Sequence, residues 1–208
     1  MITLNILNIF LMGIGFIVFL ILLSGITIIR QTERGLIETF GRYSAFANPG
    51  LLYLVPFIQK ISRVNITERM AKVASQEIIT EDKLNASVDL VVYYKVKKDE
   101  ESVKKSIYEI NDFESQIITL AQTTARNVIG EMEFKNVNSK RKILNTKLKE
   151  ILSDETTSWG VDILRVELKE IIPPKDVQDT MNKVIKAEND KRSAIDFATA
   201  RETEADGL

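Results

Sequence analysis

The sequence contains no cysteine and no histidine in its 208 residues. Without cysteine, a disulfide framework, a thiolate zinc site and a cysteine nucleophile are excluded. Without histidine, an imidazole metal site, a Ser-His-Asp triad and a histidine pH switch are excluded. These two absences remove most hydrolase chemistry from the functions that the chain can perform.

The chain also lacks an excess of charge of either sign. It has 28 Lys and Arg against 29 Asp and Glu, for a formal net charge of −1. A protein that binds a nucleic-acid backbone normally shows a strong basic excess, so we expect no nucleic-acid partner. The nine glycines form no G-x-x-x-x-G-K loop, and no serine stands in a G-x-S-x-G turn. A Ser-Lys dyad stays formally open, but we expect no enzyme, no catalytic residue, no metal and no cofactor.

Charge is missing altogether from residues 1–29, and Arg30 is the first charged residue. A helix needs about 20 mostly apolar residues to cross a bilayer, so this stretch predicts an N-terminal transmembrane helix. Two alternatives fit less well. A cleaved secretory signal has a basic start and a shorter apolar core, and a buried helix of a soluble protein has a polar face.

Basic residues follow the predicted span at Arg30, Arg34 and Arg42. By the positive-inside rule they predict a single-pass protein of the cell membrane with a cytoplasmic body. Because three arginines are few, an extracytoplasmic body stays an alternative.

The hydropathy pattern of residues 32–97 has a period of two. Residues 84–97 alternate apolar and polar over a long stretch, which is typical of a half-buried strand. Shorter segments at 35–40, 64–66 and 73–79 predict further strands, with a turn at 81–83. We expect an antiparallel sheet.

The period then changes to that of helices. Residues 110–130 predict one amphipathic helix, capped by Asn111 or Asp112, and a second helix follows Ser139 and ends near Gly160. Residues 161–172 return to alternation, and a long helix is predicted from Lys175 onward. The expected fold is α+β, divided into an anchor (1–29), a mainly β, membrane-proximal subdomain (30–98), a subdomain of two helices and a strand (99–172) and a C-terminal oligomerisation helix (173–208).

The C-terminal helix carries a narrow apolar stripe that weakens toward its end. As an isolated two-stranded coiled coil it would be weak, whereas small residues allow many copies to approach closely. We therefore expect this helix to join copies of the chain into a large homo-oligomer through Val177, Met181, Val184, Ala187, Glu188, Lys191, Ala194, Ile195 and Ala198.

Two further segments are candidate contact surfaces. An uncharged run close to the anchor is either a membrane-interface segment or a buried strand; it comprises Pro49, Gly50, Leu51, Leu52, Tyr53, Pro56 and Phe57. A basic stretch of the second helix contacts an acidic face of a neighbouring protomer or anionic lipid head groups, or is simply solvated; it comprises Lys140, Arg141, Lys142, Lys147 and Lys149.

Six sequence blocks occur in the order found in one known family. They are Glu33-Arg34-Gly35 through Phe40-Gly41-Arg42, Asn48-Pro49-Gly50 to Pro56-Phe57-Ile58, Gln76-Glu77 with Thr80 and Asp82, Leu120-Ala121-Gln122-Thr123-Thr124 with Arg126 and Ile129-Gly130, Trp159-Gly160-Val161, and Ile172-Pro173-Pro174 with Met181, Ala187-Glu188 and Lys191-Arg192. The chain thereby resembles the prokaryotic stomatin branch of the SPFH or band 7 superfamily, which includes prohibitins and flotillins. It departs from the family at Lys98-Asp99-Glu100, where Asp-Pro is frequent, and its lack of cysteine excludes palmitoylation as in animal stomatins.

The resemblance implies an SPFH domain and a membrane-anchored scaffold that is not an enzyme. Such a protein homo-oligomerises into a ring or cage, organises a membrane microdomain and regulates membrane proteins or a protease. The implied partners are copies of the chain itself, membrane lipids and a membrane-bound serine protease of the NfeD type. The alternative is a small regulatory subunit that binds a membrane protease or channel through its C-terminal helix without forming a large cage.

Overall fold

The computed structural model describes residues 11–13, 15–16, 19, 21 and 23–205, and the side chains up to residue 199. The remaining residues of the predicted transmembrane helix, 1–10, 14, 17–18, 20 and 22, lie outside the described part. Those described between 11 and 23 are helical. Within the described residues, no helix combines the length and apolar character that a bilayer crossing requires.

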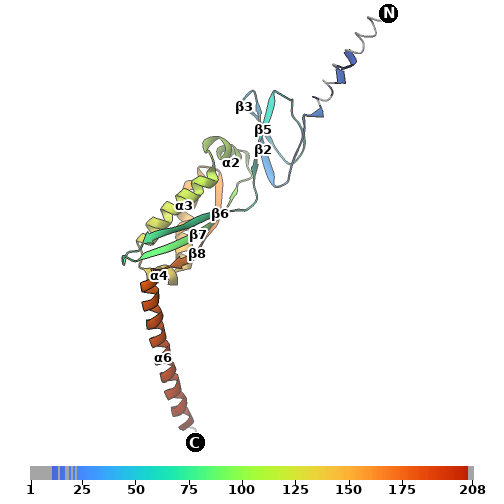
Figure 1. Ribbon diagram of the computed structural model, residues 1–208. Helices are drawn as coiled ribbons and strands as arrows, with labels where there is room; N and C mark the ends of the chain where they lie inside the picture. Colours follow the sequence, from blue (N-terminus) through green and yellow to red (C-terminus); the bar gives the residue numbers. More distant parts are fainter. Residues whose placement is uncertain (1–10, 14, 17–18, 20, 22, 206–208) are drawn as a thin grey trace, which may run out of the picture.

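Two small antiparallel sheets follow the N-terminal segment (Figure 1). Strand β1 (Ile26–Ile29) pairs with β4 (Gly50–Tyr53), and β2 (Glu33–Thr39) lies between β3 (Arg42–Ala47) and β5 (Gln59–Asn65). The predicted boundary of the anchor at residue 29 therefore needs correction, because its last four residues belong to a sheet. The β-branched sequence Ile-Thr-Ile-Ile suits a strand as well as it suits a continuous apolar run.

A three-stranded antiparallel sheet forms the larger part of the protein, which we call the body (residues 69–172). Its strands β6 (Arg69–Ile79), β7 (Asn85–Val96) and β8 (Val161–Ile172) lie in the order β6-β7-β8. The helices α3 (Phe113–Gly130) and α5 (Arg141–Thr157) cover one face of this sheet, and the short α4 (Phe134–Ser139) connects them. The predicted alternation of β7 is confirmed, because every second side chain from Ala86 to Val96 is buried against these helices.

A short helical segment between β7 and α3 contacts the small sheets. It consists of α2 (Glu100–Lys104) and the π-helical turn η1 (Lys105–Glu109). The Tyr43 hydroxyl donates a hydrogen bond to Glu100, and the Lys104 ammonium lies 3.7 Å from the centre of the Tyr43 ring. The Tyr108 hydroxyl donates to Glu38 at 2.9 Å. Burial, together with this hydrogen bond to Glu38, raises the pKa of Tyr108 to about 12.

The departure from the family at residues 98–100 has a local structural explanation. Asp99 is the N-cap of α2, and its carboxylate accepts a hydrogen bond from the Ser102 backbone N–H at 2.9 Å. That backbone hydrogen bond lowers the pKa of Asp99. A five-residue helix is too short to show a hydrophobic period, and the sequence pattern therefore did not predict α2.

The last helix, α6 (Lys175–Ala205), starts after Pro173-Pro174 and extends away from the body, on the side opposite the N-terminal segment (Figure 1). Proline is compatible with the entry to a helix because its missing N–H would lack a partner there in any case. The predicted long helix is confirmed, and nearly all of its described side chains are exposed.

Candidate membrane interface and contact surfaces

Large apolar side chains are exposed on the two small sheets, at the end of the molecule that the N-terminal segment enters (Figure 1). On β1 and β4, the cross-strand pairs Ile26–Tyr53 and Ile28–Leu51 present one apolar face to solvent. We call this face, together with the exposed phenylalanines Phe40 and Phe57, the tip. The tip is uncharged although more than a quarter of the residues in the chain are charged.

Residues 49–57 contain the strand β4, whose two faces differ in burial, so a strand is confirmed here while the membrane-interface role stays a prediction. Leu51 and Tyr53 point outward, whereas Leu52 packs against the small core of Ile29, Ile37, Ala47 and Leu54. Leu52 is therefore partly buried, on the inner side of β4. Of the turn residues, Pro49 and Pro56 are half-buried, Gly50 is exposed with a φ of +139°, and Phe57 is almost fully exposed.

Phe57 has a backbone conformation that rarely accommodates a phenylalanine. It stands third in the turn from Val55 to Ile58, which is closed by a hydrogen bond from the Ile58 N–H to the Val55 carbonyl at 3.3 Å. Pro56 takes the second position, and Phe57 has a φ of +67°. This is the pattern of a type II turn, in which glycine or asparagine is preferred at the third position.

Phe40 repeats this feature in the neighbouring turn. The loop between the paired residues Thr39 and Arg42 consists of Phe40 and Gly41, with φ values of +50° and +77°. Two positive φ values define the type I′ hairpin turn, for which Asn-Gly is the preferred sequence. The Phe40 N–H donates to the Ile58 carbonyl at 3.0 Å, so the two turns lie side by side.

Each of these phenylalanines carries a backbone cost of about 1–2 kcal/mol relative to glycine. A buried ring would offset this cost through packing, but Phe40 is 78% and Phe57 is 91% exposed. No packing contact among the described residues therefore offsets the backbone cost of either phenylalanine. Phe40 was missed by the sequence analysis; the signal was Phe-Gly at a hairpin position where Asn-Gly is usual.

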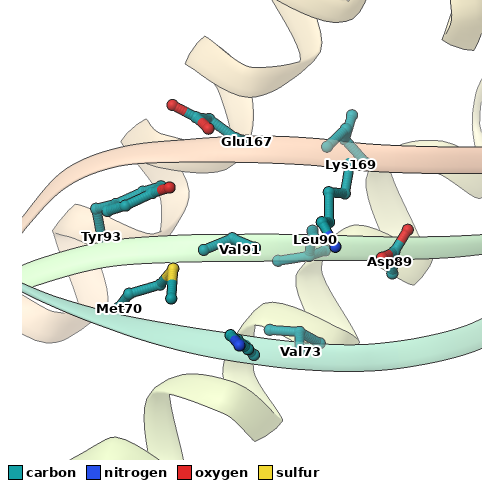
Figure 2. A pocket seen from close by; sticks show the side chains of 10 residues that line it. Met70, Val73, Asp89, Leu90, Val91, Tyr93, Glu167 and Lys169 are labelled. Carbon is teal, nitrogen blue, oxygen red and sulfur yellow. The ribbon is translucent and has the colours of Figure 1, made fainter.

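The face of the β6-β7-β8 sheet that carries no helix, which we call the open sheet face, contains a hollow of about 510 Å³. Figure 2 shows Met70, Val91 and Tyr93 along its floor, between charged side chains of all three strands. Val91 is only 8% exposed although no helix covers it. Register shifts in both strand pairs, typical of β-bulges, accompany this concave shape.

The basic stretch of the second predicted helix lies on α5 and the residues just before it. Lys140, Lys142 and Lys149 form no ion pair with any described residue, and Arg141 donates to the Asn138 side chain. Lys147 is the exception, since its ammonium lies 3.6 Å from Glu131. The acidic residues Glu100, Glu101 and Glu114 pair with other cations, namely Lys104, Lys105 and Arg69.

The candidate oligomerisation residues lie along α6 without cover from the rest of the chain. Val177 is half-buried, and the others, Met181, Val184, Ala187, Glu188, Lys191, Ala194, Ile195 and Ala198, are exposed. Phe197 is 72% exposed on the opposite, more polar side of the helix.

The described part of the chain places no three acidic side chains where they could hold a metal ion together.

The fold agrees with a comparison to known families. The model of the SPFH domain / Band 7 family matches residues 27–205. The chain therefore belongs to this family, as the order of its motifs predicted. Proteins of the family are membrane-associated, and membership indicates a scaffold role at a membrane.

Among individual relatives, a stomatin homolog of Pyrococcus horikoshii is 31% identical over 191 residues, which cover 92% of this chain and 70% of the homolog. An uncharacterized protein of Methanocaldococcus jannaschii is 43% identical over 182 residues, covering 88% of this chain and 89% of that protein. An uncharacterized protein of Methanothermobacter thermautotrophicus is 37% identical over 172 residues, and the matched region is 53% of its length. The chain thus spans about half of this last relative. The Pyrococcus homolog, together with the family match, confirms the resemblance to the prokaryotic stomatins.

Proposed function

We propose that the protein is a single-pass, membrane-anchored scaffold that assembles with copies of itself into a ring or cage and is not an enzyme. In this role it organises a patch of bilayer and regulates membrane proteins or a partner membrane protease of the NfeD type. The charge-free segment before β1 is the anchor, and the three arginines that follow the span favour a cytoplasmic body.

The observation that carries the membrane role is the pair of strained, exposed phenylalanines at the tip. In water, Phe40 and Phe57 combine an unfavourable backbone with unfavourable exposure. In a bilayer interface, burial of apolar area contributes about 25 cal/mol per Å², which for a phenyl ring exceeds the backbone cost. The tip is therefore suited to contact the membrane beside the anchor.

Self-assembly is supported by α6. Its apolar stripe is exposed from Met181 onward, and an isolated helix of this composition gains little stability in water. Copies that are anchored in one bilayer have already lost part of their translational freedom, so weak helix contacts add up to a stable assembly.

A small regulatory subunit that uses α6 to bind a protease or channel is the competing function. The mass of the detergent-extracted protein separates the two: many copies support the scaffold, and a species of monomer mass contradicts it.

The membrane role is tested by flotation of a chain that lacks residues 1–23, a deletion that keeps β1 intact. Vesicles of phosphatidylcholine and phosphatidylglycerol serve as the membrane. We expect this truncated chain to float, and we expect Phe40→Ser with Phe57→Ser to reduce the floating fraction severalfold. Phe197→Ser is the control, because it removes another largely exposed ring from α6, far from the tip. If the double variant floats as well as the truncated parent chain, the tip does not contact the membrane.

A further inference from the structure

We infer that adjacent copies contact each other head to tail through their bodies: the first turns of α5 in one copy dock on the open sheet face of the next, at the end where α6 begins. This inference rests on the proposed function in one respect, namely that the copies stand side by side in one bilayer. It goes beyond that function by assigning a second interface, separate from α6.

The charges of α5 are arranged against its helix dipole. Lys140 occupies the N-cap without a side-chain hydrogen bond to the helix, and Arg141 and Lys142 occupy the first turn. The acids Asp154 and Glu155 stand near the other end. Cations are unfavourable at a helix N-terminus and anions at a C-terminus. The cost of this arrangement falls if an anionic surface outside the chain meets the first turns of α5.

The start of α5 also has the apolar character of a contact surface. Ile143 is 64% exposed in the middle of the basic stretch. Together with Lys142, Thr146, Lys147 and Glu150, it lines a shallow hollow of about 440 Å³. An exposed isoleucine close to Lys140 and Lys142, which form no ion pair with a described residue, fits a protein surface that is apolar and acidic.

The open sheet face offers such a surface at one end. Ile79 and Ile172 are 66% and 47% exposed there, and a hollow of about 210 Å³ lies between Glu77, Asn85, Ser87 and the segment Ile172-Pro173-Pro174. Glu77, Asp89 and Glu170 surround these apolar groups, and none forms an ion pair with a described residue. Lys169 on β8 and Lys72 on β6 line the neighbouring hollow together with Asp89, so the three acids face two cations.

The two surfaces lie at the same end of the body. The Glu81 N–H donates to the Met132 carbonyl at 3.1 Å, and the Phe134 N–H donates to Asp82 at 3.2 Å. The β6–β7 turn is thereby fastened to the segment that leads into α5. Strand β8 also ends here, where α6 departs (Figure 1).

The two surfaces also lie on opposite faces of the body, since α5 covers one face of the sheet and the open sheet face is the other. Copies that share one orientation in a bilayer can therefore place α5 of each copy against the open sheet face of its neighbour. Such a heterologous contact closes into a ring when the rotation between copies allows it. An antiparallel pairing of two α5 helices, by contrast, would direct the two anchors to opposite sides.

Disulfide cross-linking tests the contact directly, because the chain has no cysteine of its own. Two differently tagged full-length chains are co-expressed, one with Ile143→Cys and one with Ile172→Cys, and membranes are oxidised. We expect a cross-linked dimer that carries both tags. The control combines Ile143→Cys with Tyr108→Cys, since Tyr108 is also exposed but lies in η1, at the other end of the body, and this pair should not cross-link.

Charge reversal tests the chemistry of the same contact. Lys140→Glu with Lys142→Glu, or Glu77→Lys with Glu170→Lys, should each lower the yield of the cross-link between positions 143 and 172 at least severalfold. All four substitutions in one chain should restore it. Lys183→Glu with Lys186→Glu makes the same change of charge on α6 and should leave the yield unchanged.

The outcomes separate this inference from the proposed function. If the extracted protein is a complex of many copies but the two cysteines do not cross-link, or the fourfold charge exchange does not restore the yield, the α5 contact is refuted and the scaffold stands. A cross-link from position 143 to a different protein also refutes it. A monomer after extraction overturns both.

Discussion

At the scale of single residues, substitutions at Phe57 should change stability and membrane binding in opposite directions. With a φ of +67°, its backbone disfavours any residue with a Cβ. We expect Phe57→Gly to raise the stability of the detergent-extracted protein by about 1 kcal/mol and, at the same time, to weaken flotation of the chain lacking residues 1–23. Thermal unfolding of the extracted protein measures the first effect.

The matched control at this position is Phe57→Ala, which removes the ring but keeps the Cβ. It should weaken flotation as much as Phe57→Gly without the gain in stability. Equal stability of the glycine and alanine variants would show that the turn carries no strain. Such a result would remove the main argument that the phenylalanine is kept for contact with the membrane.

The same two phenylalanines show what a sequence pattern contains and what it does not. Phe57 stood in a recognisable uncharged run, so it was among the predicted interface residues, whereas Phe40 ended a predicted strand and gave no reason to expect exposure. Leu52 was also predicted to lie at the membrane interface because it belongs to the same uncharged run, but its side chain packs inward. Alternation along a strand shows that neighbours differ in direction, but which face meets the core depends on the pairing partner.

At the scale of elements, long periodic segments were predicted well and short ones were not. Strands β7 and β8 and helices α3, α5 and α6 have enough residues to display a period, and they were found close to their actual bounds. The strands β1 and β3 and the short helices α2 and α4 were not recognised, and the four-residue strand β4 was predicted only as one of two alternatives. Their formation depends on tertiary partners, such as β4 for β1, which no local pattern contains.

The apolar stripe of α6 gives the prediction that belongs to this scale. Val184 is 53% exposed near the middle of the helix, and we expect Val184→Asp to shift the detergent-extracted protein from complexes of many copies toward smaller species. Burial of an unpaired carboxylate between helices is strongly unfavourable. Size-exclusion chromatography with light scattering measures the change. Asn182→Asp, which adds the same charge on another side of α6, is the control, and equal loss of large complexes in both variants would argue against a stripe-specific contact.

At the scale of the whole molecule, the near-zero net charge conceals an uneven distribution. Residues 1–29 carry no charge, and the body pairs many of its charges within the chain, as in the contacts of Arg165 with Glu68 and Glu167 at 2.9 and 3.0 Å. The charges without an ion pair to a described residue include, at the end where α6 departs, cations on α5 and acids on the open sheet face. A balanced total charge permits close packing of like copies, because no common charge repels them.

The anchor should matter for assembly as well as for location. Anchored copies meet in two dimensions and in one orientation, so deletion of residues 1–23 should weaken self-association by about 10²–10⁴-fold, the range in which linked binding exceeds its separate parts. Dilution of the truncated chain in solution, followed by sedimentation velocity, should show dissociation at concentrations where the full-length protein in membranes still cross-links through positions 143 and 172. A substituted anchor, an unrelated apolar helix fused before Ser24, should restore cross-linking, since only the alignment of the copies is required. Truncated chains that remain large at every dilution would show that α6 and the body suffice, and the anchor would then serve for location alone.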